Sequence, residues 1–167
     1  MPVTAAQVKE LRDKTGAGIM DAKRALEEAD GDSSKAEALL NEKGLASAAK
    51  KADRSTSEGL VVSYIHTGGR VGALVELNCE TDFVARTDDF EALGRNIAMQ
   101  VAAMSPAYVD RDSIPDGVED VKGEELLLEQ EYIRDSSMKI SDVVKETIGK
   151  LGENIRIRRF SRFELGL

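Results

Sequence analysis

The chain has 167 residues, which is enough for one medium-sized domain and a small additional unit. Hydrophobic residues make up 41% of it and charged residues 32%, a composition typical of a globular protein rather than a disordered one. No stretch approaches the roughly 18 apolar residues that span a bilayer, and the first twenty residues lack the apolar run of a secretory signal. The single cysteine, Cys79, cannot form an internal disulfide or supply a metal cluster. We therefore expect a cytoplasmic protein that binds no membrane, metal or cofactor.

The formal net charge is −8, and it is distributed unevenly. Residues 1–54 carry equal numbers of acidic and basic side chains, residues 55–153 have a net charge of −11, and residues 154–167 have a net charge of +3. The acidic middle argues against direct nucleic-acid binding, because phosphate neutralisation needs clustered Lys and Arg. Four arginines near the C-terminus alternate with apolar residues, and we interpret them as the polar face of a strand. They are Arg156, Arg158, Arg159 and Arg162.

The N-terminal fifty residues have the pattern of three short helices. A capping box formed by Thr4 and Gln7 predicts the start of the first helix, and the glycine-rich residues 15–18 end it. Apolar side chains at helical spacing predict a second helix over about residues 19–29.

The third helix is expected to be short. A capping box at Ser34 predicts its start, its apolar pattern reaches Leu40, and Gly44 stands where a C-terminal cap belongs. Residues 46–57 are small, polar and basic, which predicts a linker that is first helical and then flexible.

Beyond the linker the hydrophobic period changes from 3.6 to 2. Residues 60–65 and 71–77 alternate as strands, and the glycine-containing residues between them predict a β-hairpin. A last strand is expected over about residues 154–163. Three further helices are predicted, one capped by Asp88 and Glu91, one very acidic over about residues 119–134, and one over residues 140–151.

These elements predict an α+β fold of two units. Residues 1–54 should form a three-helix bundle with its linker, and residues 55–167 a core with a three-stranded antiparallel sheet and covering helices. On the hairpin strands Val61, Ile65 and Leu74 have the parity opposite to the main apolar set, so the second face of the sheet should also carry apolar side chains. A monomer would expose this patch, which predicts a homodimer.

Signals for covalent catalysis are weak. Gly16 and Gly18 could begin a phosphate-binding glycine pattern, but Asp21 occupies the third position and a helix rather than a strand precedes it. The only histidine, His66, falls at the tip of the predicted hairpin, where a solvated turn residue is the simplest role. Cys79 ends an apolar strand, which is typical of an inert buried thiol.

The segment Thr81–Val84 is unusual, because Phe83 stands beside charge just after a strand and just before a helix. Two interpretations are open. The ring could fold back under the following helix as a core residue, or it could be exposed for binding.

Three stretches resemble one known family. Residues 78–86 (Asn-Cys-Glu-Thr-Asp-Phe-Val-Ala-Arg) closely resemble the signature loop of elongation factor Ts. Residues 9–12 (Lys-Glu-Leu-Arg) with residues 15–23 (Thr-Gly-Ala-Gly-Ile-Met-Asp-Ala-Lys) are similar to its N-terminal module, and residues 152–159 (Gly-Glu-Asn-Ile-Arg-Ile-Arg-Arg) to a third family stretch. The matches follow the family's order and together cover essentially the whole chain.

The resemblance implies a ubiquitin-associated-like N-terminal module and a non-covalent guanine nucleotide exchange factor for elongation factor Tu. It implies that the Thr-Asp-Phe-Val loop enters the partner's GTPase domain beside its Mg²⁺ site and that the N-terminal module also contacts this domain. Ile19 or Met20 could instead be core residues. The implied loop residues are Thr81, Asp82, Phe83 and Val84. The implied contacts of the N-terminal module are Lys9, Arg12, Ile19, Met20 and Lys23.

Longer members of this family carry two core modules, and this chain resembles the single-core members, which pair two chains. The resemblance therefore implies a complex of two factors with two GTPases. Two other functions are open from the residues alone: an adaptor whose three-helix unit binds helical or ubiquitin-like partners, and a ribosome-associated RNA binder that uses the C-terminal arginines.

Overall fold

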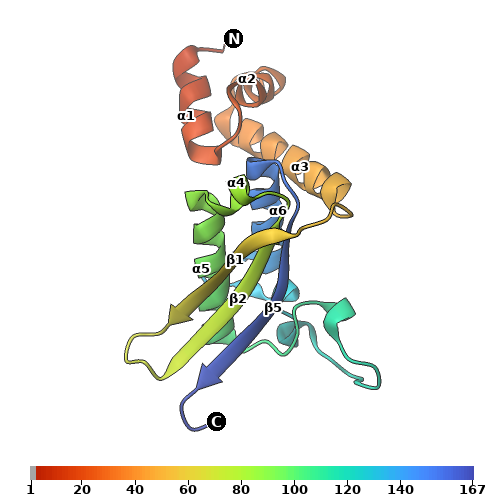
Figure 1. Cartoon of the computed structure of the whole chain (residues 1–167). Helices are drawn as coiled ribbons and strands as arrows, with labels where there is room; N and C mark the ends of the chain where they lie inside the picture. The colour runs from red at the N-terminus through yellow and green to blue at the C-terminus, as the bar shows by residue number, and fades with distance from the viewer. Residues whose placement is uncertain (1–2) are drawn as a thin grey trace.

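The fold is that of a computed structural model, which describes residues 3–167. Three N-terminal helices stand at one end of the molecule, and a three-stranded sheet backed by two long helices forms the rest (Figure 1). The helices are α1 (Ala5–Thr15), α2 (Ile19–Glu28), α3 (Ser33–Lys51), α4 (Asp82–Ala85), α5 (Asp88–Met104) and α6 (Ile140–Leu151). The strands are β1 (Glu58–Ile65), β2 (Val71–Cys79), β3 (Glu131–Tyr132), β4 (Asp135–Lys139) and β5 (Ile155–Glu164).

The first two helices form as predicted. Thr4 caps α1 in a reciprocal capping box, in which the Thr4 side chain accepts from the Gln7 N–H and the Gln7 side chain accepts from the Thr4 N–H. Gly16 then ends α1 in the left-handed conformation at φ 69°. The helices α1, α2 and α3 enclose a small core whose members include Leu11, Leu26 and Ala36.

The predicted short third helix was wrong. Helix α3 begins after Asp32, whose carboxylate accepts from the Ser34 and Lys35 N–H groups, and it continues through Gly44 to Lys51. Gly44 does not end the helix and lies instead where α3 crosses α6. A Cβ built on Gly149 of α6 would stand only 2.9 Å from the Gly44 Cα. Glycine at this crossing therefore permits close approach of two backbones rather than a helix stop.

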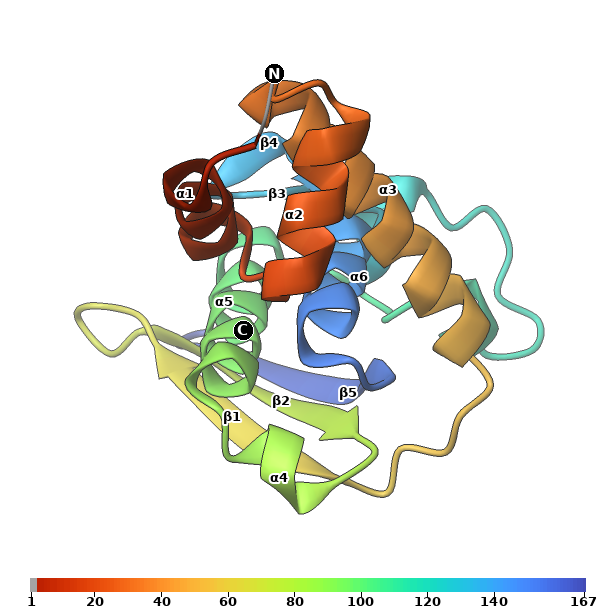
Figure 2. The same cartoon turned by 90° about the horizontal axis from the view of Figure 1, so that it is seen from above.

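The main sheet is antiparallel in the order β1-β2-β5, so β2 is its central strand. Figure 2 shows α5 and α6 on one face of the sheet, with the N-terminal helices beyond them. The side chains of Val75 and Leu77 point into this layer and are fully buried with Phe90 and Ile97 of α5. The predicted hairpin and last strand are therefore confirmed, and so is the α+β class.

The other face of the sheet is not covered by any element of residues 3–167. Val61 is 71% exposed and Phe163 is 73% exposed, and Ile65 and Leu74 on the same face are also exposed. The expected second apolar face is therefore present, on the side turned away from α5 and α6.

Helix α5 begins at a different cap from the one predicted. The Thr87 hydroxyl accepts from the Phe90 N–H at 3.3 Å, so the predicted cap at Asp88 was wrong. Asp88 and Glu91 lie instead in the first turn, where negative charge favours the positive end of the helix dipole.

The predicted acidic helix over residues 119–134 was also wrong. The segment contains short 3₁₀ turns at Gly123–Glu125 and Leu127–Glu129, followed by the hairpin of β3 and β4. Its irregular backbone is held by the buried Gln100 of α5, whose side chain donates to the Glu131 carbonyl and accepts from the Ile133 N–H. A uniform helix would lose these contacts, and its clustered carboxylates would repel one another.

The crossing of α3 and α6 makes a testable prediction with a matched pair of variants. Gly149→Ala should destabilise the protein by about 1–3 kcal/mol, because its methyl group meets the Gly44 backbone. Gly44→Ala places its Cβ at an ordinary 3.9 Å from the Gly149 Cα and should gain about 0.5–1 kcal/mol from helix propensity. Urea unfolding measures both, and equal stability of the two variants would contradict the close crossing.

Candidate partner-binding site

The loop between β2 and α5 presents an aromatic side chain to solvent. Helix α4 follows Thr81, whose hydroxyl accepts from the Val84 N–H at 3.4 Å. Val84 and Ala85 are buried in the main core and anchor this short helix, whereas Phe83 is 79% exposed. The interpretation of Phe83 as a core residue was therefore wrong, and the buried phenylalanine of this region is Phe90 of α5.

The start of the loop is held by the carboxylate of Glu153, which follows α6. Glu153 Oε2 accepts from the Glu80 N–H at 3.1 Å and from the Thr81 N–H at 3.0 Å. Glu153 Oε1 accepts from the Thr81 hydroxyl at 2.5 Å. Three donors from the end of β2 thus converge on one carboxylate from a distant part of the chain.

The Glu80 carboxylate makes the reciprocal contact, from the loop to the residue that follows Glu153. Glu80 Oε1 accepts from the Asn154 N–H at 2.7 Å and lies 3.5 Å from the Arg54 guanidinium. The buried Asn154 side chain donates to the carbonyls of Ala52 and Arg54, just after α3. These contacts were missed from the sequence, in which only the tract Gly-Glu-Asn between a helix and a strand hinted at them.

Cys79 lies directly under the loop and supports it without reactive chemistry. Its thiol donates to the Thr81 carbonyl at 3.1 Å. Burial raises the pKa of Cys79 to about 11, and the nearby Glu153 carboxylate acts in the same direction. The thiol is therefore protonated at neutral pH, which confirms the expected inert buried cysteine.

Asp82 is positioned beside Phe83 on the surface. Its carboxylate lies 2.9 Å from the Arg86 guanidinium one turn later in the chain, and both side chains are substantially exposed. Such an exposed pair is weak and is easily exchanged for another partner. The loop therefore offers an aromatic ring next to a carboxylate that can change its contact.

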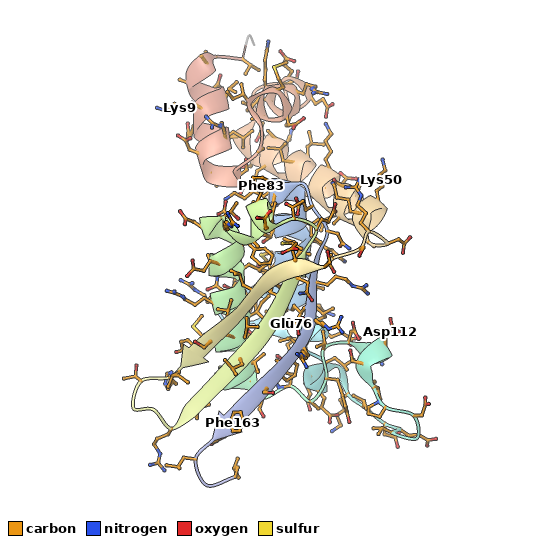
Figure 3. All side chains as sticks on the ribbon, viewed as in Figure 1. Lys9, Lys50, Glu76, Phe83, Asp112 and Phe163 are labelled. Atoms are coloured by element: carbon orange, nitrogen blue, oxygen red, sulfur yellow. The ribbon has the colours of Figure 1, made fainter. Side chains whose placement is uncertain are left out.

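All five candidate contact residues of the N-terminal unit are exposed. Ile19 and Met20 at the start of α2 are 58% and 59% exposed, so the interpretation of either as a core residue was wrong. Lys23 lies 3.7 Å from Glu27 on the same helix, and Lys9 and Arg12 are one turn apart on α1. Figure 3 shows Phe83 at the same end of the molecule as these helices.

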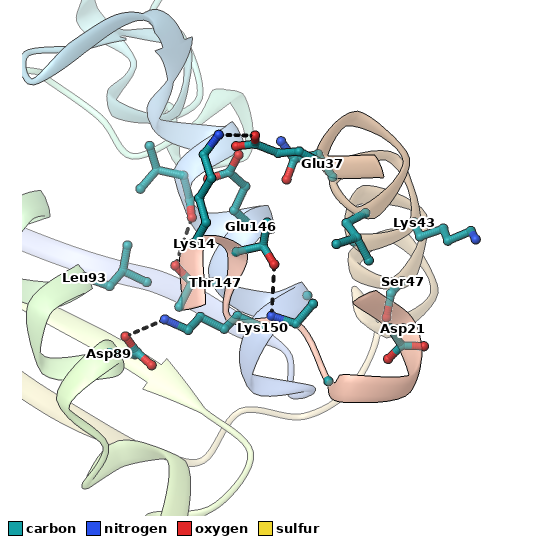
Figure 4. A pocket seen from close by; sticks show the side chains of 18 of the residues that line it. Lys14, Asp21, Glu37, Lys43, Ser47, Asp89, Leu93, Glu146, Thr147 and Lys150 are labelled. Carbon is teal, nitrogen blue, oxygen red and sulfur yellow. Dashed lines mark hydrogen bonds and ion pairs between the residues drawn. The ribbon is translucent and has the colours of Figure 1, made fainter. Parts of the chain in front are cut away.

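A cleft of about 770 Å³ separates the N-terminal unit from the core (Figure 4). Lys150 of α6 crosses it, lies against Gly16 and forms an ion pair of 2.9 Å with Asp89 of α5. Burial raises the pKa of Glu146 on the same wall above its ordinary value, and Asp142 adds to this effect. The lining carries both signs of charge and does not converge on one ligand group.

The C-terminal arginines are largely engaged within the protein. Arg159 forms an ion pair of 2.7 Å with Glu76, and the hydrogen bond from Arg159 holds the pKa of Glu76 below its ordinary value. Arg158 lies 3.7 Å from the same carboxylate, and Arg162 pairs with Glu164 at 2.8 Å. These contacts favour the interpretation as a strand face and disfavour an RNA-binding surface, because the carboxylates compete with phosphate.

Across residues 3–167, no group of three or more His, Cys, Asp or Glu side chains is arranged to hold a metal ion. No helix in the same range is long and apolar enough to cross a membrane.

The fold and the loop define a two-part α+β protein that holds an exposed aromatic side chain on a fixed base. A family model described as "Elongation factor TS" matches residues 34–123. A protein of Thermoanaerobacter sp. (strain X514) named Elongation factor Ts is 50% identical, with 98% of this chain and 95% of the relative covered. Relatives of the same name in Carboxydothermus hydrogenoformans and Fervidobacterium nodosum are 49% and 46% identical, with 98% and 99% of this chain and 89% and 100% of each relative covered. The chain belongs to the elongation factor Ts family.

Proposed function

We propose that this protein promotes GDP release from elongation factor Tu by inserting the loop Thr81–Val84 near the Mg²⁺ site of the GTPase domain. Membership of the family implies a nucleotide exchange factor for elongation factor Tu, which acts without covalent chemistry. The observation that carries the finer proposal is Phe83, whose ring is 79% exposed on a base fixed by hydrogen bonds. An exposed aromatic on a rigid base is a typical interface hot spot.

The exchange step follows from thermodynamic linkage. GDP is held in a GTPase by backbone amides and by Mg²⁺ bound to phosphate oxygens. A factor that binds the empty GTPase more tightly than the loaded one must weaken nucleotide binding by the same ratio. GDP then leaves, GTP binds and displaces the factor, and the equilibrium between nucleotides is unchanged.

Phe83 and Asp82 have different roles in this proposal. The Phe83 ring enters between packed elements of the GTPase domain and favours an alternative packing in which the nucleotide is held less tightly. The Asp82 carboxylate exchanges its contact with Arg86 for groups around the metal, where it competes with the existing ligands. Thr81 and Val84 hold the loop in place, through the hydrogen bond between them and the burial of Val84.

The N-terminal unit supplies affinity. Ile19 and Met20 offer apolar area on α2, and Lys9, Arg12 and Lys23 offer positive charge on the exposed faces of α1 and α2. The similarity of residues 1–54 to a ubiquitin-associated module and the cytoplasmic location stay predictions.

The working form in this proposal is a homodimer that binds two GTPases. The bare face of the sheet carries Val61, Ile65, Leu74 and Phe163, and a second copy of the same face would cover them by two-fold pairing. Monomeric proteins rarely leave a contiguous apolar patch of this kind in water.

Phe83→Ala should lower stimulated GDP release by about 30-fold or more. An anchoring aromatic commonly contributes about 2 kcal/mol or more at an interface, and 1.4 kcal/mol corresponds to a factor of ten. Because the ring is so exposed, the free energy of unfolding should stay within about 0.5 kcal/mol of wild type. Release of labelled GDP from elongation factor Tu and urea unfolding measure the two quantities.

Val118→Ala serves as the control for Phe83→Ala, since Val118 is another exposed apolar residue, located between α5 and α6. It should exchange as wild type does. Asp82→Ala should be slower than wild type but faster than Phe83→Ala, because the ring is retained. Wild-type exchange by Phe83→Ala would refute the proposed insertion.

The double variant Ile19→Ala, Met20→Ala should raise the factor concentration needed for half-maximal exchange by about 10-fold, the loss expected from weakening two apolar contacts. The maximal rate of GDP release should stay unchanged, because the loop is intact. Leu45→Ala on α3 is a control, as another exposed apolar residue in the N-terminal unit. Collapse of the maximal rate at every concentration would show that this unit orients the loop instead.

Light scattering at micromolar concentration should give about twice the 18.1 kDa chain mass. Phe163→Asp should give a monomer, because burial of a charge in an apolar interface is unfavourable. Val118→Asp introduces the same charge away from the sheet and should remain dimeric. A wild-type monomer with full exchange activity would contradict the dimer.

A further inference from the structure

The end of β2 leaves backbone donors that the sheet no longer satisfies. The ladder with β1 and β5 ends at Cys79, so the N–H groups of Glu80 and Thr81 need other acceptors. Both donate to a single oxygen of Glu153, at 3.1 and 3.0 Å. Hydrogen bonds to a charged acceptor are stronger than those between neutral groups.

The Thr81 hydroxyl links this carboxylate to α4. The hydroxyl donates to Glu153 Oε1, which fixes its direction, and it accepts from the Val84 N–H, which caps α4. A change at Glu153 would therefore remove the acceptor that orients the Thr81 hydroxyl and weaken the cap of the helix that carries Phe83.

The direction of Glu153 is set by the preceding residue. Gly152 ends α6 in the left-handed conformation at φ 78°, and the chain turns there before β5 begins. The next residue, Asn154, donates its N–H to Glu80 and its side-chain amide to the segment after α3. The loop and the junction of α6 and β5 are thus joined twice, because Glu153 accepts from the loop and Glu80 accepts from Asn154.

We propose that Glu153 is a positioning residue for nucleotide exchange, which fixes the loop before the partner binds and so aims Phe83. This inference rests on the proposed function. A loop that is already ordered loses less conformational entropy on binding, which increases affinity without a new contact. Glu153 itself is half-buried behind the loop and acts through Thr81 rather than by touching the partner.

Glu153→Ala should raise the factor concentration needed for half-maximal GDP release by at least about 10-fold, the effect expected from losing hydrogen bonds to a charged group. Glu153→Gln retains an acceptor oxygen and should lose less. Thr81→Ser retains the hydroxyl, so the factor concentration needed for half-maximal GDP release should stay within about 3-fold of wild type. A 3-fold change lies near the lower limit of what one neutral hydrogen bond contributes. Glu129→Ala is the matched control, because Glu129 is also half-buried and pairs with Arg111 at 2.9 Å, away from α4.

A double-mutant cycle separates the positioning of Phe83 by Glu153 from a general stabilisation of the fold. In the Phe83→Ala background, Glu153→Ala should change the factor concentration needed for half-maximal GDP release by less than about 2-fold, because the ring that Glu153 positions is absent. If the two effects multiply instead, Glu153 does not act through Phe83 and the inference is overturned.

Amide hydrogen exchange of the isolated factor tests the positioning without the partner. In Glu153→Ala the amides of Glu80, Thr81 and Val84 should lose protection, because their acceptors are Glu153 and the Thr81 hydroxyl, while the sheet amides keep theirs. If Glu153→Ala fails to fold, Glu153→Gln carries the same comparison. Unchanged protection of Glu80, Thr81 and Val84 would overturn the inference. Failure of the wild type to accelerate GDP release would overturn the proposed function, and hydrogen exchange would still test whether Glu153 orders the loop.

Discussion

Two backbone N–H groups at the end of β2, those of Glu80 and Thr81, determine how the rest of the site is built. They leave the ladder at a point where the chain must turn outward, and a buried or half-buried amide without an acceptor is costly. The acceptor is a carboxylate located 72 residues or more along the chain, so the loop can take this shape only once β5 has joined the sheet and α6 has packed on it. The core therefore serves as the support for the exposed ring of Phe83.

Helix α3 gives the N-terminal unit a fixed relation to this support. Ala36 near its start packs in the small core of the three-helix unit, and Ala48 near its end packs in the main core. The glycines of α3 and α6 allow the two backbones to meet. A division at residue 54 therefore follows a helix that packs in both cores, so the N-terminal helices are joined to the core through α3 rather than through a flexible linker.

Local patterns predicted the parts of the fold that depend on neighbouring residues, such as the capping box at Thr4 and the β1–β2 hairpin. The predictions failed where a distant contact overrides the local signal. Gly44 looked like a helix stop because the facing Gly149 cannot be seen from the sequence, and the segment after Val118 looked helical because its anchor, Gln100, precedes it by a long interval. The loop residues were identified from a family resemblance. The role of Glu153 depends on its hydrogen bonds to Glu80 and Thr81, which are distant in the sequence and cannot be predicted from a local pattern.

The two exposed surfaces of the core lie far apart, which bears on how a dimer and a partner could coexist. Phe83 is at the end of the molecule near the N-terminal helices, and Phe163 is near the opposite end of the sheet (Figure 3). The ion pairs of Glu76 with Arg158 and Arg159 lie along β2 and β5 between them and give the bare face a polar section. Pairing of two copies through the apolar end would leave both Phe83 loops accessible. Each loop could then engage its own GTPase without displacing the other copy, which is the geometric requirement of a complex with two factors and two partners.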